Sequence, residues 1–434
     1  MAQRFFPTPT PTPTPTTQQW KQCVLNASTS VFLDTKGQIW VHGWNNRQQL
    51  GFPASRDNIE FKPHPTLTNI KRIIGATHDG YFLEDNQGQI WVMGSSYYGE
   101  LGIGKGVAYK NPDERTDERQ QLLACTLPVV VPGLHRNDIK DIVCGQTSFI
   151  IKKDGSVLAC GRNDYGQLGL GHANYCNQFT LVPNLQNVER IFNNWHSTFF
   201  KLQDGSILAC GENRDGHLAL PKTENGHYTP TLALTKEAKI KDILKMRDIH
   251  FYQLFLTEDN TLLVAGKYVQ KGLVNHQDHS VTPITIVNAV KDVQNGWECI
   301  YFLHHDNTVS ALGDPSHEGL SGDYSTLRQI PGLTNIKKLR VTDLSHIIAL
   351  DTDGQVFSTA PFVQASLLDS EKESTLIPTL QHIPLNQKAT DIFNGYRYNL
   401  MTMEDGSIQG FGDPKEVPEC MQIPALTPQQ KKGF

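Results

Sequence analysis

The chain has 434 residues, a mass of 48.6 kDa and a formal net charge of −5 at pH 7. This length suits two or three ordinary domains or one large repeat array, and the acidic balance argues against nucleic acid or anionic lipid as a main partner. No apolar run reaches the ~18 residues of a membrane span and the N-terminus lacks an apolar signal core, so we expect no span, no lipid anchor and a cytoplasmic location. The eight cysteines form no C-x-x-C pair, which predicts reduced, buried thiols.

Residues 1–19 form the first segment, and positions 7–17 of it read PTPTPTPTPTT. Alternating Pro and Thr can neither pair as a strand nor bury a core, which predicts a disordered leader that acts as a spacer. The last residues, 427–434, are expected to be a flexible tail. The folded part is therefore predicted to span residues 20–426.

One unit recurs throughout that span: a β-rich run, a turn at Asp-Gly or a related pair, and a second run that usually ends in Gly. The eight copies read VFLDTKGQIWVHG, YFLEDNQGQIWVMG, IIKKDGSVLACG, FFKLQDGSILACG, FLTEDNTLLVAG, YFLHHDNTVSALG, IIALDTDGQVFSTA and LMTMEDGSIQGFG. Two such runs joined by Asp-Gly predict a β-hairpin.

The turn position of each hairpin is predicted to need a left-handed backbone. The eight residues at this position are Gly37, Gly88, Gly155, Gly205, Asn260, Asn307, Gly354 and Gly406. Asn replaces Gly twice, and Asn is the side chain that next best tolerates positive φ. We therefore assign these residues a structural role. Successive positions differ by 51, 67, 50, 55, 47, 47 and 52 residues.

Each hairpin has a short lead-in strand before it, such as IKRIIG, IKDIVCG or VKDVQNG, and several have a tail with Pro followed by Leu. Proline cannot donate to a strand ladder, so the Pro-bearing strand is predicted to be the outermost of four. A period near 50 residues with four strands per unit is typical of a β-propeller. We predict an all-β chain, a single propeller of four-stranded blades with eight repeat units. The alternative is seven blades with one terminal unit packed elsewhere.

The string GRNDYGQLGLG at Gly161–Gly171 resembles the repeat of the regulator of chromosome condensation family. Weaker copies are GWNNRQQLG at Gly43–Gly51, GSSYYGELGIG at Gly94–Gly104 and GENRDGHLAL at Gly211–Leu220. In the last four units only the hairpin and the lead-in survive. The resemblance implies a propeller, typically of seven blades, whose founding member uses a wedge from one blade to release nucleotide from the small GTPase Ran.

Motifs of enzymatic chemistry do not occur in the sequence. It has no P-loop, no H-E-x-x-H, no G-x-S-x-G and no Cys/His set with metal spacing. His304-His305-Asp306 coincides with a predicted hairpin turn, which indicates solvated turn residues. We expect no hydrolytic, transferase or redox activity, no catalytic residues, no metal and no cofactor.

Function is then expected in loops that the rigid frame displays. The resemblance points to the corner between lead-in and hairpin, where aromatic and Arg side chains are typical of interface hot spots. The predicted partner-binding residues are His78, Asp79, Trp195, His196, Asp248, Trp297, Glu298, Asp343, Tyr396 and Arg397. For the histidines, hydrogen bonding to backbone carbonyls between blades is the alternative.

The spacing of 67 residues indicates an insertion at about 106–126. Its middle is dense in mixed charges, and it is a positional analogue of the family's wedge without a residue-level match. The candidate residues in it are Asp113, Glu114, Arg115 and Arg119. A solvated loop is the alternative interpretation.

The repeat pattern predicts a monomeric interaction propeller, and the family resemblance implies that it binds a small GTPase of the Ran type and acts as an exchange factor or regulator. The alternative is an interaction scaffold without exchange activity, which the erosion of the last four units favours. Chromatin binding would need a basic tail that residues 6–19 lack, and ultraviolet-B sensing would need a packed Trp cluster. The eroded repeats also resemble bacterial effectors that mimic this family inside host cells.

Overall fold

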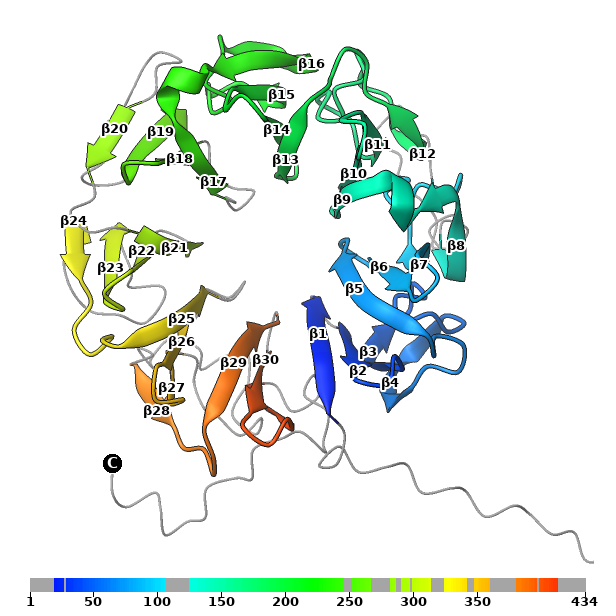
Figure 1. Cartoon of the computed structure of the whole chain (residues 1–434), viewed down its shortest axis with the longest axis vertical. Helices are drawn as coiled ribbons and strands as arrows, with labels where there is room; N and C mark the ends of the chain where they lie inside the picture. The colour runs from blue at the N-terminus through cyan, green and yellow to red at the C-terminus, as the bar shows by residue number, and fades with distance from the viewer. Residues whose placement is uncertain are drawn as a thin grey trace, which may run out of the picture.

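The computed structural model is a ring of β-sheets around one central axis (Figure 1). It describes residues 19–26, 29–106, 125–244, 252–266, 282–285, 290–296, 299–313, 324–341, 347–359, 380–395 and 398–412. There are eight sheets, and each is built from one continuous stretch of the chain; we number them units 1–8 in chain order. The prediction of an eight-bladed propeller is therefore confirmed, and no blade is shared between the two ends of the described chain.

In every sheet the strands follow one another in sequence order, with the lead-in strand nearest the axis (Figure 1). The first strands are β1 (Trp20–Asn26), β5 (Ile70–Ala76), β9 (Ile139–Val143), β13 (Val188–Asn193), β17 (Ile240–Leu244), β21 (Val290–Asn295), β25 (Ile336–Val341) and β29 (Ala389–Asn394). The second strands are β2 (Thr29–Asp34), β6 (Gly80–Asp85), β10 (Thr147–Lys152), β14 (Ser197–Leu202), β18 (Tyr252–Thr257), β22 (Cys299–His304), β26 (Ile347–Asp351) and β30 (Tyr398–Met403).

The hairpin is completed by the third strand, and the outer edge is formed by the fourth. The third strands are β3 (Ile39–Asn45), β7 (Gln89–Ser95), β11 (Val157–Gly161), β15 (Ile207–Asn213), β19 (Thr261–Gly266), β23 (Val309–Gly313), β27 (Val356–Ser358) and β31 (Ile408–Gly412). The fourth strands are β4 (Ser55–Pro63), β8 (Cys125–His135), β12 (Cys176–Leu181), β16 (Thr223–Leu234), β20 (Thr282–Thr285), β24 (Tyr324–Gln329) and β28 (Gln381–Ile383). Two short 3-10 helices, η2 (Arg136–Asp138) and η3 (Lys236–Ala238), lead into β9 and β17.

The predicted turn positions have the backbone that the sequence required. All eight, from Gly37 to Gly406, have positive φ between 62° and 89°, including Asn260 and Asn307. The turns also touch the next blade: the Gly37 carbonyl accepts from the Ile70 N–H at 2.9 Å, and the Gly354 carbonyl accepts from the Ala389 N–H at 2.9 Å. The turn therefore sets both the hairpin and the spacing between units.

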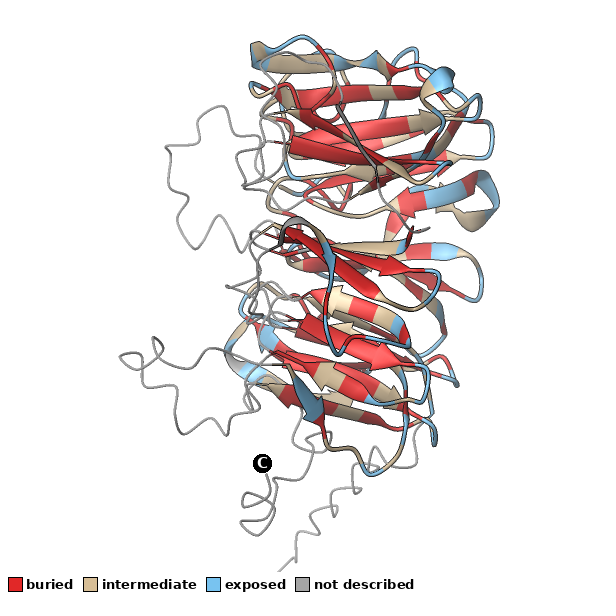
Figure 2. Ribbon diagram, turned by 90° about the vertical axis from the view of Figure 1, so that its left-hand side faces the viewer, coloured by how far each residue is buried: buried red, intermediate tan, exposed pale blue. Residues whose placement is uncertain are grey.

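Neighbouring blades are held together by apolar side chains of their second strands. Phe199 and Phe200 are adjacent on β14 and so point to opposite faces of the sheet. Phe200 meets Phe149 of β10 edge to face at 5.8 Å, and Phe199 meets Phe255 of β18 at 5.5 Å. The side view shows buried residues running through the sheets, with exposed residues in the connecting loops (Figure 2).

The ring closes by packing between unit 8 and unit 1. Tyr398 of β30 lies in one apolar cluster with Phe32 of β2, and its hydroxyl is 2.8 Å from the Ser30 Oγ. The same hydroxyl donates to the Thr29 carbonyl at 3.1 Å. Trp20 and Trp40 also pack in this cluster, 5.9 Å apart and edge to face. The aromatic groups of unit 1 thus belong to the closure of the ring.

The predicted turn at 304–306 is corrected in one respect. His305 and Asp306 are exposed, as expected, but His304 is buried and its Nε2 lies 2.9 Å from the Ser310 Oγ. His304 occupies the last position of β22, where side chains of this face enter the core between blades. The seven described cysteines are free thiols.

Candidate functional site

The ring has two different faces. We call the side that carries the hairpin turns, such as Gly37 and Gly155, the turn face. The opposite side is the corner face, where the first strand of each blade passes to the second. The loops that come after the third strands begin on the corner face too, because Gly94 pairs with Gly80 and Gly161 pairs with Thr147.

The loops after the third strands of units 1, 3 and 4 share one internal clamp. An Asn in each loop accepts, through Oδ1, from the N–H of a buried Leu at 2.9–3.0 Å, and donates through Nδ2 to carbonyls farther along the loop. The pairs are Asn45–Leu50, Asn163–Leu168 and Asn213–Leu218. In unit 2 the Ser96 Oγ takes the place of the amide oxygen and accepts from the Leu101 N–H at 3.1 Å. This clamp explains the Asn and Leu of the repeat motif.

Of the ten predicted corner residues, His78, Asp79, Trp195 and His196 lie in the described part of the chain. Asp248, Trp297, Glu298, Asp343, Tyr396 and Arg397 lie outside the described residues, as do Asp113, Glu114, Arg115 and Arg119 of the insertion. The described residues that flank the insertion are on the corner face, where the Lys105 Nζ donates to the Cys125 carbonyl at 3.0 Å. The insertion therefore starts and ends beside the predicted corners.

His78 and Asp79 form a charged cluster with Arg47 of the neighbouring unit. The Asp79 carboxylate lies 2.5 Å from Nη1 of Arg47 and 3.1 Å from Nδ1 of His78. The hydrogen bond with Asp79 raises the pKa of His78, although burial opposes it. Burial would raise the pKa of Asp79, but the His78 and Arg47 contacts outweigh it and lower that pKa. His78 is thus paired with a carboxylate and not with a backbone carbonyl.

Trp195 is the exposed aromatic residue at the centre of this region, with 40% of its surface accessible. Its indole meets the His78 ring edge to face at 6.1 Å, so units 2 and 4 touch across unit 3. The Gln167 Nε2 donates to the Trp195 carbonyl at 3.1 Å, which fixes the corner backbone. The neighbouring His196 packs on the Tyr165 ring at 5.1 Å, and the Arg214 guanidinium lies 5.7 Å from the centre of the same ring.

A second aromatic group lies between units 2 and 3. Tyr98 meets Tyr175 at 5.7 Å, and the Arg162 guanidinium lies 5.4 Å from the Tyr98 ring centre. Asp164 joins the group by accepting hydrogen bonds from both Arg162 and Tyr175. We define the aromatic patch as His78, Tyr98, Tyr165, Tyr175, Trp195 and His196 together with Arg162.

Sequence reasoning missed Tyr98, Tyr165, Tyr175 and Arg162. Arg162 and Tyr165 occupy variable positions inside the repeat motif, and Tyr175 lies in the loop after it. The available signal was that these positions vary between repeats while the Asn or Ser and the Leu of the clamp around them are retained. Variable positions on a rigid loop are typical places for binding residues.

Glu100 is a buried carboxyl beneath the patch. It is 2% exposed, and its Oε2 accepts from the Tyr98 N–H at 2.8 Å. The same position in unit 3 is Gln167, whose Oε1 accepts from the Tyr165 N–H at 3.0 Å. Burial raises the pKa of Glu100 to about 8, so that at neutral pH this side chain is mostly the uncharged counterpart of Gln167.

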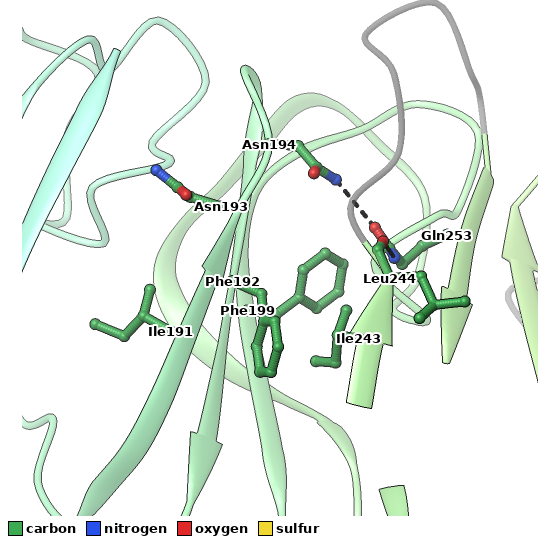
Figure 3. Close-up of a pocket in the computed structure, with 8 residues that line it drawn as sticks. All are labelled: Ile191, Phe192, Asn193, Asn194, Phe199, Ile243, Leu244 and Gln253. Atoms are coloured by element: carbon green, nitrogen blue, oxygen red, sulfur yellow. Dashed lines mark hydrogen bonds between the residues drawn. The ribbon is translucent and has the colours of Figure 1, made fainter. Parts of the chain in front are cut away.

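A small hollow opens between β13 and β17 (Figure 3). Its volume is about 180 Å³, it is lined mainly by apolar residues such as Phe192 and Ile243, and Asn194 closes it by donating to the Gln253 Oε1 at 3.0 Å. Ligand pockets usually measure about 300–1,000 Å³. The hollow is therefore a poor match for a cofactor.

In the described residues, no His, Cys, Asp and Glu side chains gather in threes as metal ligands would. Within the same residues, no helix has the length and apolar character needed to cross a bilayer.

Comparison with known proteins finds a family match over part of units 2–4, which includes some residues of the patch. The family model "Regulator of chromosome condensation (RCC1) repeat" matches residues 87–150 and 154–193, and a second model of that name matches 139–167. These ranges contain Tyr98, Tyr165 and Tyr175 of the patch, and they end just before Trp195.

Among curated proteins, protein pim1 of Schizosaccharomyces pombe is 26% identical over 197 residues, which cover 40% of this chain and 34% of pim1. The secretion-regulating guanine nucleotide exchange factor of Bos taurus is 28% identical over 150 residues, covering 33% of this chain and 28% of that protein. The matched stretch thus spans about a third or less of the length of these relatives.

Among solved structures, Prp20p of Saccharomyces cerevisiae superimposes with a TM-score of 0.55 at 14% identity, covering 92% of this chain and 95% of Prp20p. This likeness concerns the fold alone. The chain is therefore an eight-bladed propeller in which residues 87–150 and 154–193 match the regulator of chromosome condensation repeat.

Proposed function

We propose that this protein binds a small GTPase, of the Ran type, through the corner face of units 1–4. The observation that carries the proposal is the aromatic patch, because half-exposed Tyr, Trp and Arg side chains on rigid loops are the residues that dominate interface energies. The Asn clamp holds these loops before a partner arrives, so little ordering cost is added on binding.

Two relatives support the class of partner. The bovine relative is named as a guanine nucleotide exchange factor, and the structure of Prp20p was described together with its binding properties to Gsp1p and histones. Charged side chains in and beside the patch are paired within the chain, as in Arg47–Asp79 and Arg162–Asp164. A partner would therefore be held mainly by aromatic and hydrogen-bonding contacts, with little dependence on salt.

The binding test uses a panel of small GTPases, each prepared with GDP and without nucleotide, and isothermal titration calorimetry with the purified chain. We expect binding to one GTPase, weakened by Trp195→Ala and by Tyr165→Ala. The matched control is Leu232→Ala, because Leu232 is an exposed apolar side chain on the outer strand β16. Absence of binding across the panel, or equal weakening by Leu232→Ala, would contradict the proposal.

Exchange activity is the finer proposal for the same site. An exchange factor binds the nucleotide-free GTPase most tightly, so nucleotide and protein compete by thermodynamic linkage. We expect the chain to accelerate release of labelled GDP from the GTPase it binds. Binding without acceleration would instead support the non-catalytic scaffold, which is favoured by the loss of the repeat motif from the sequence of the last four units.

We further propose that the protein acts as a monomer in the cytoplasm of a eukaryotic cell, as a bacterial effector would after delivery. The eroded repeats and the acidic net charge motivate this proposal. Light scattering would report the mass of the particle, and a translocation reporter fused to the chain would report delivery. A stable dimer would contradict the monomeric state, and a reporter that stays in the bacterium would contradict delivery into the eukaryotic cell.

A further inference from the structure

The first strands of all eight blades share one irregularity. Their pairing with the second strands skips the second residue of the first strand, so that a β-bulge occurs at the same place in every blade. A bulge re-aims the side chain of the extra residue away from its regular position in the sheet. The bulged residues are Lys21, Lys71, Lys140, Glu189, Lys241, Lys291, Lys337 and Thr390.

Six of these eight residues are lysines, and all six are exposed. The first strands lie nearest the axis, with neighbouring blades on both sides (Figure 1). Because each bulged residue belongs to the innermost strand of its blade, the six lysines are arranged in a ring around the axis. The preceding residues, Ile70 or Val290 for example, are buried between blades. In each of these six blades the residue before the bulge thus packs in the apolar core, whereas the bulged lysine is exposed.

The lysines are connected from blade to blade. The Lys21 Nζ donates to the Lys71 carbonyl at 2.6 Å, the Lys291 Nζ to the Lys337 carbonyl at 3.3 Å and the Lys337 Nζ to the Thr390 carbonyl at 3.3 Å. Each of these bonds goes to the bulge of the next blade. An ammonium group has three N–H donors, so one such bond orients the group and leaves donors for a ligand.

Most carboxylates next to the bulged lysines form ion pairs with Arg or Lys side chains outside the bulges. Three aspartates at the residue after the bulge are paired: Asp292 with Arg340 at 3.1 Å, Asp242 with Arg190 at 3.5 Å, and Asp391 with Lys338. Among ion pairs of the described residues, only Lys71 of the ring has a carboxylate partner, the Glu84 Oε1 at 3.1 Å. Six lysines and one glutamate therefore make the bulge ring strongly positive in a chain whose net charge is −5.

We propose that this bulge ring binds a compact polyphosphate on the axis of the propeller. Lysine serves as a point-charge ligand for phosphate, and six such charges around one axis favour an anion of high charge density. Ammonium groups around one axis suit an anion whose charges point outward in several directions. A long polyanion would meet the acidic remainder of the surface and be repelled.

The ring is separate from the corner face. The bulges lie one residue from the turn-face end of the first strands, and Lys71 is seven residues from His78. At the rise of a strand this is about 20 Å. The inference is therefore independent of the proposed GTPase site.

The test is isothermal titration calorimetry of the full chain with inositol hexakisphosphate, and with inorganic phosphate for comparison. We expect one molecule bound per chain, binding that weakens steeply with added salt, and much weaker binding of inorganic phosphate. The variant Lys241→Gln/Lys291→Gln/Lys337→Gln should weaken binding about tenfold or more, because three charge-assisted hydrogen bonds lose their charge. Glutamine keeps an N–H donor for the carbonyl of the next blade.

The matched control is Lys36→Gln/Lys153→Gln/Lys236→Gln, which removes the same charge from exposed positions outside the ring. Equal affinities of the ring variant and the wild-type chain, or equal weakening in the control, would overturn the proposal. If the ring variant does not fold, as seen by circular dichroism, the single variants Lys21→Gln and Lys241→Gln provide the same comparison.

A second arm distinguishes the source of the phosphate. Flotation with phosphatidylcholine vesicles that contain phosphatidylinositol 4,5-bisphosphate reports a lipid headgroup. If the ring variant loses binding of inositol hexakisphosphate, the site is supported and its occupant is a free polyphosphate. If the ring variant loses binding to the vesicles, the site is supported and its occupant is a lipid headgroup. Binding of a polyglutamate peptide in preference to both phosphates would overturn the assignment of ligand class.

Discussion

Units 1–4 and units 5–8 have the same blade and differ in the loop after its third strand. Both halves keep the hairpin, the positive-φ turn residue and the bulge near the axis. In sequence, only units 1–4 have both the Asn or Ser and the Leu at these loop positions, and in the described residues these pairs clamp the corner-face loop, as in Asn163–Leu168. The contrast separates two requirements: backbone geometry is retained wherever a blade must form, whereas the loop motif is retained where aromatic side chains must be presented.

The contrast between units 1–4 and units 5–8 is tested most strongly by removing the Asn clamp from one loop of units 1–4. Asn163 is fully buried and makes hydrogen bonds with the Leu168 N–H and with the His172 and Asn174 carbonyls. Asn163→Ala leaves those groups without a partner, and we expect a loss of about 3–4 kcal/mol in the free energy of unfolding. Urea denaturation measures it, with the exposed Asn174→Ala as control. A loss no greater than that of the control would show that the clamp does not stabilise the loop.

The second prediction uses the difference between Glu100 and Gln167. Burial raises the pKa of Glu100 from 4.5 to about 8 in the folded protein, so the folded chain keeps a proton that the unfolded chain releases above pH 4.5. The stability that this proton provides is complete below pH 4.5 and is lost as the pH rises through about 8. Glu100→Gln should remove this pH dependence and stabilise the protein by about 2–3 kcal/mol at pH 7.

Thermal or urea unfolding from pH 5 to pH 8 checks this result. The control is Glu224→Gln, since Glu224 is exposed on the outer strand β16. An unchanged pH dependence in Glu100→Gln would mean that Glu100 titrates as an ordinary carboxyl.

The third prediction compares the two halves directly as binding surfaces. Trp195→Ala should weaken binding of the GTPase by about tenfold to thirtyfold, the loss typical of an aromatic hot spot. Trp297→Ala, at the corresponding corner of unit 6, should weaken it less, because its unit lacks the clamped loop motif in sequence. Calorimetric affinities decide the point. Equal losses would place the partner over the whole corner face and remove the distinction between the halves.

The smallest effect is expected at the turns, where the halves are alike. Asn307 has φ of 62°, so Asn307→Gly should change the free energy of unfolding by less than about 0.5 kcal/mol. Asn307→Ala should cost about 1 kcal/mol, because Ala lacks the short polar side chain whose local hydrogen bonds let Asn adopt this conformation. Gly155→Ala should resemble Asn307→Ala. A large difference between these two alanine variants would show that the turns of the two halves are not equivalent.

Much of the fold could be predicted because its requirements recur. Positive φ at one position of every hairpin restricts that position to Gly or Asn, which leaves a period that can be counted in the sequence. Tyr98, Tyr175 and Trp195 follow no such period, since each is the product of one loop and they meet only when three blades pack. The corner residues His78 and Trp195 were predicted singly, but their contact across unit 3 depends on the curvature of the ring.

The bulge at Lys71 and its equivalents shows the same limit in another form. The repeated Lys is visible in the lead-ins IKRIIG, IKDIVCG and VKDVQNG. Alternation along a regular strand would place it against a neighbouring blade. The skipped pairing between Ile70 and Arg72 takes Lys71 out of that alternation, and register shifts of this kind have no signature in one strand's sequence.

Hydrogen–deuterium exchange of the chain, free and bound to its GTPase, tests the central claim most directly. We predict slower exchange on binding in the corners and clamped loops of units 1–4, which include residues 77–80, 95–106, 161–175 and 194–197. The hairpin turns, such as residues 153–156 and 203–206, should be unchanged. Protection confined to the turn face or to the corners of units 5–8 would contradict the assignment of the partner to the aromatic patch.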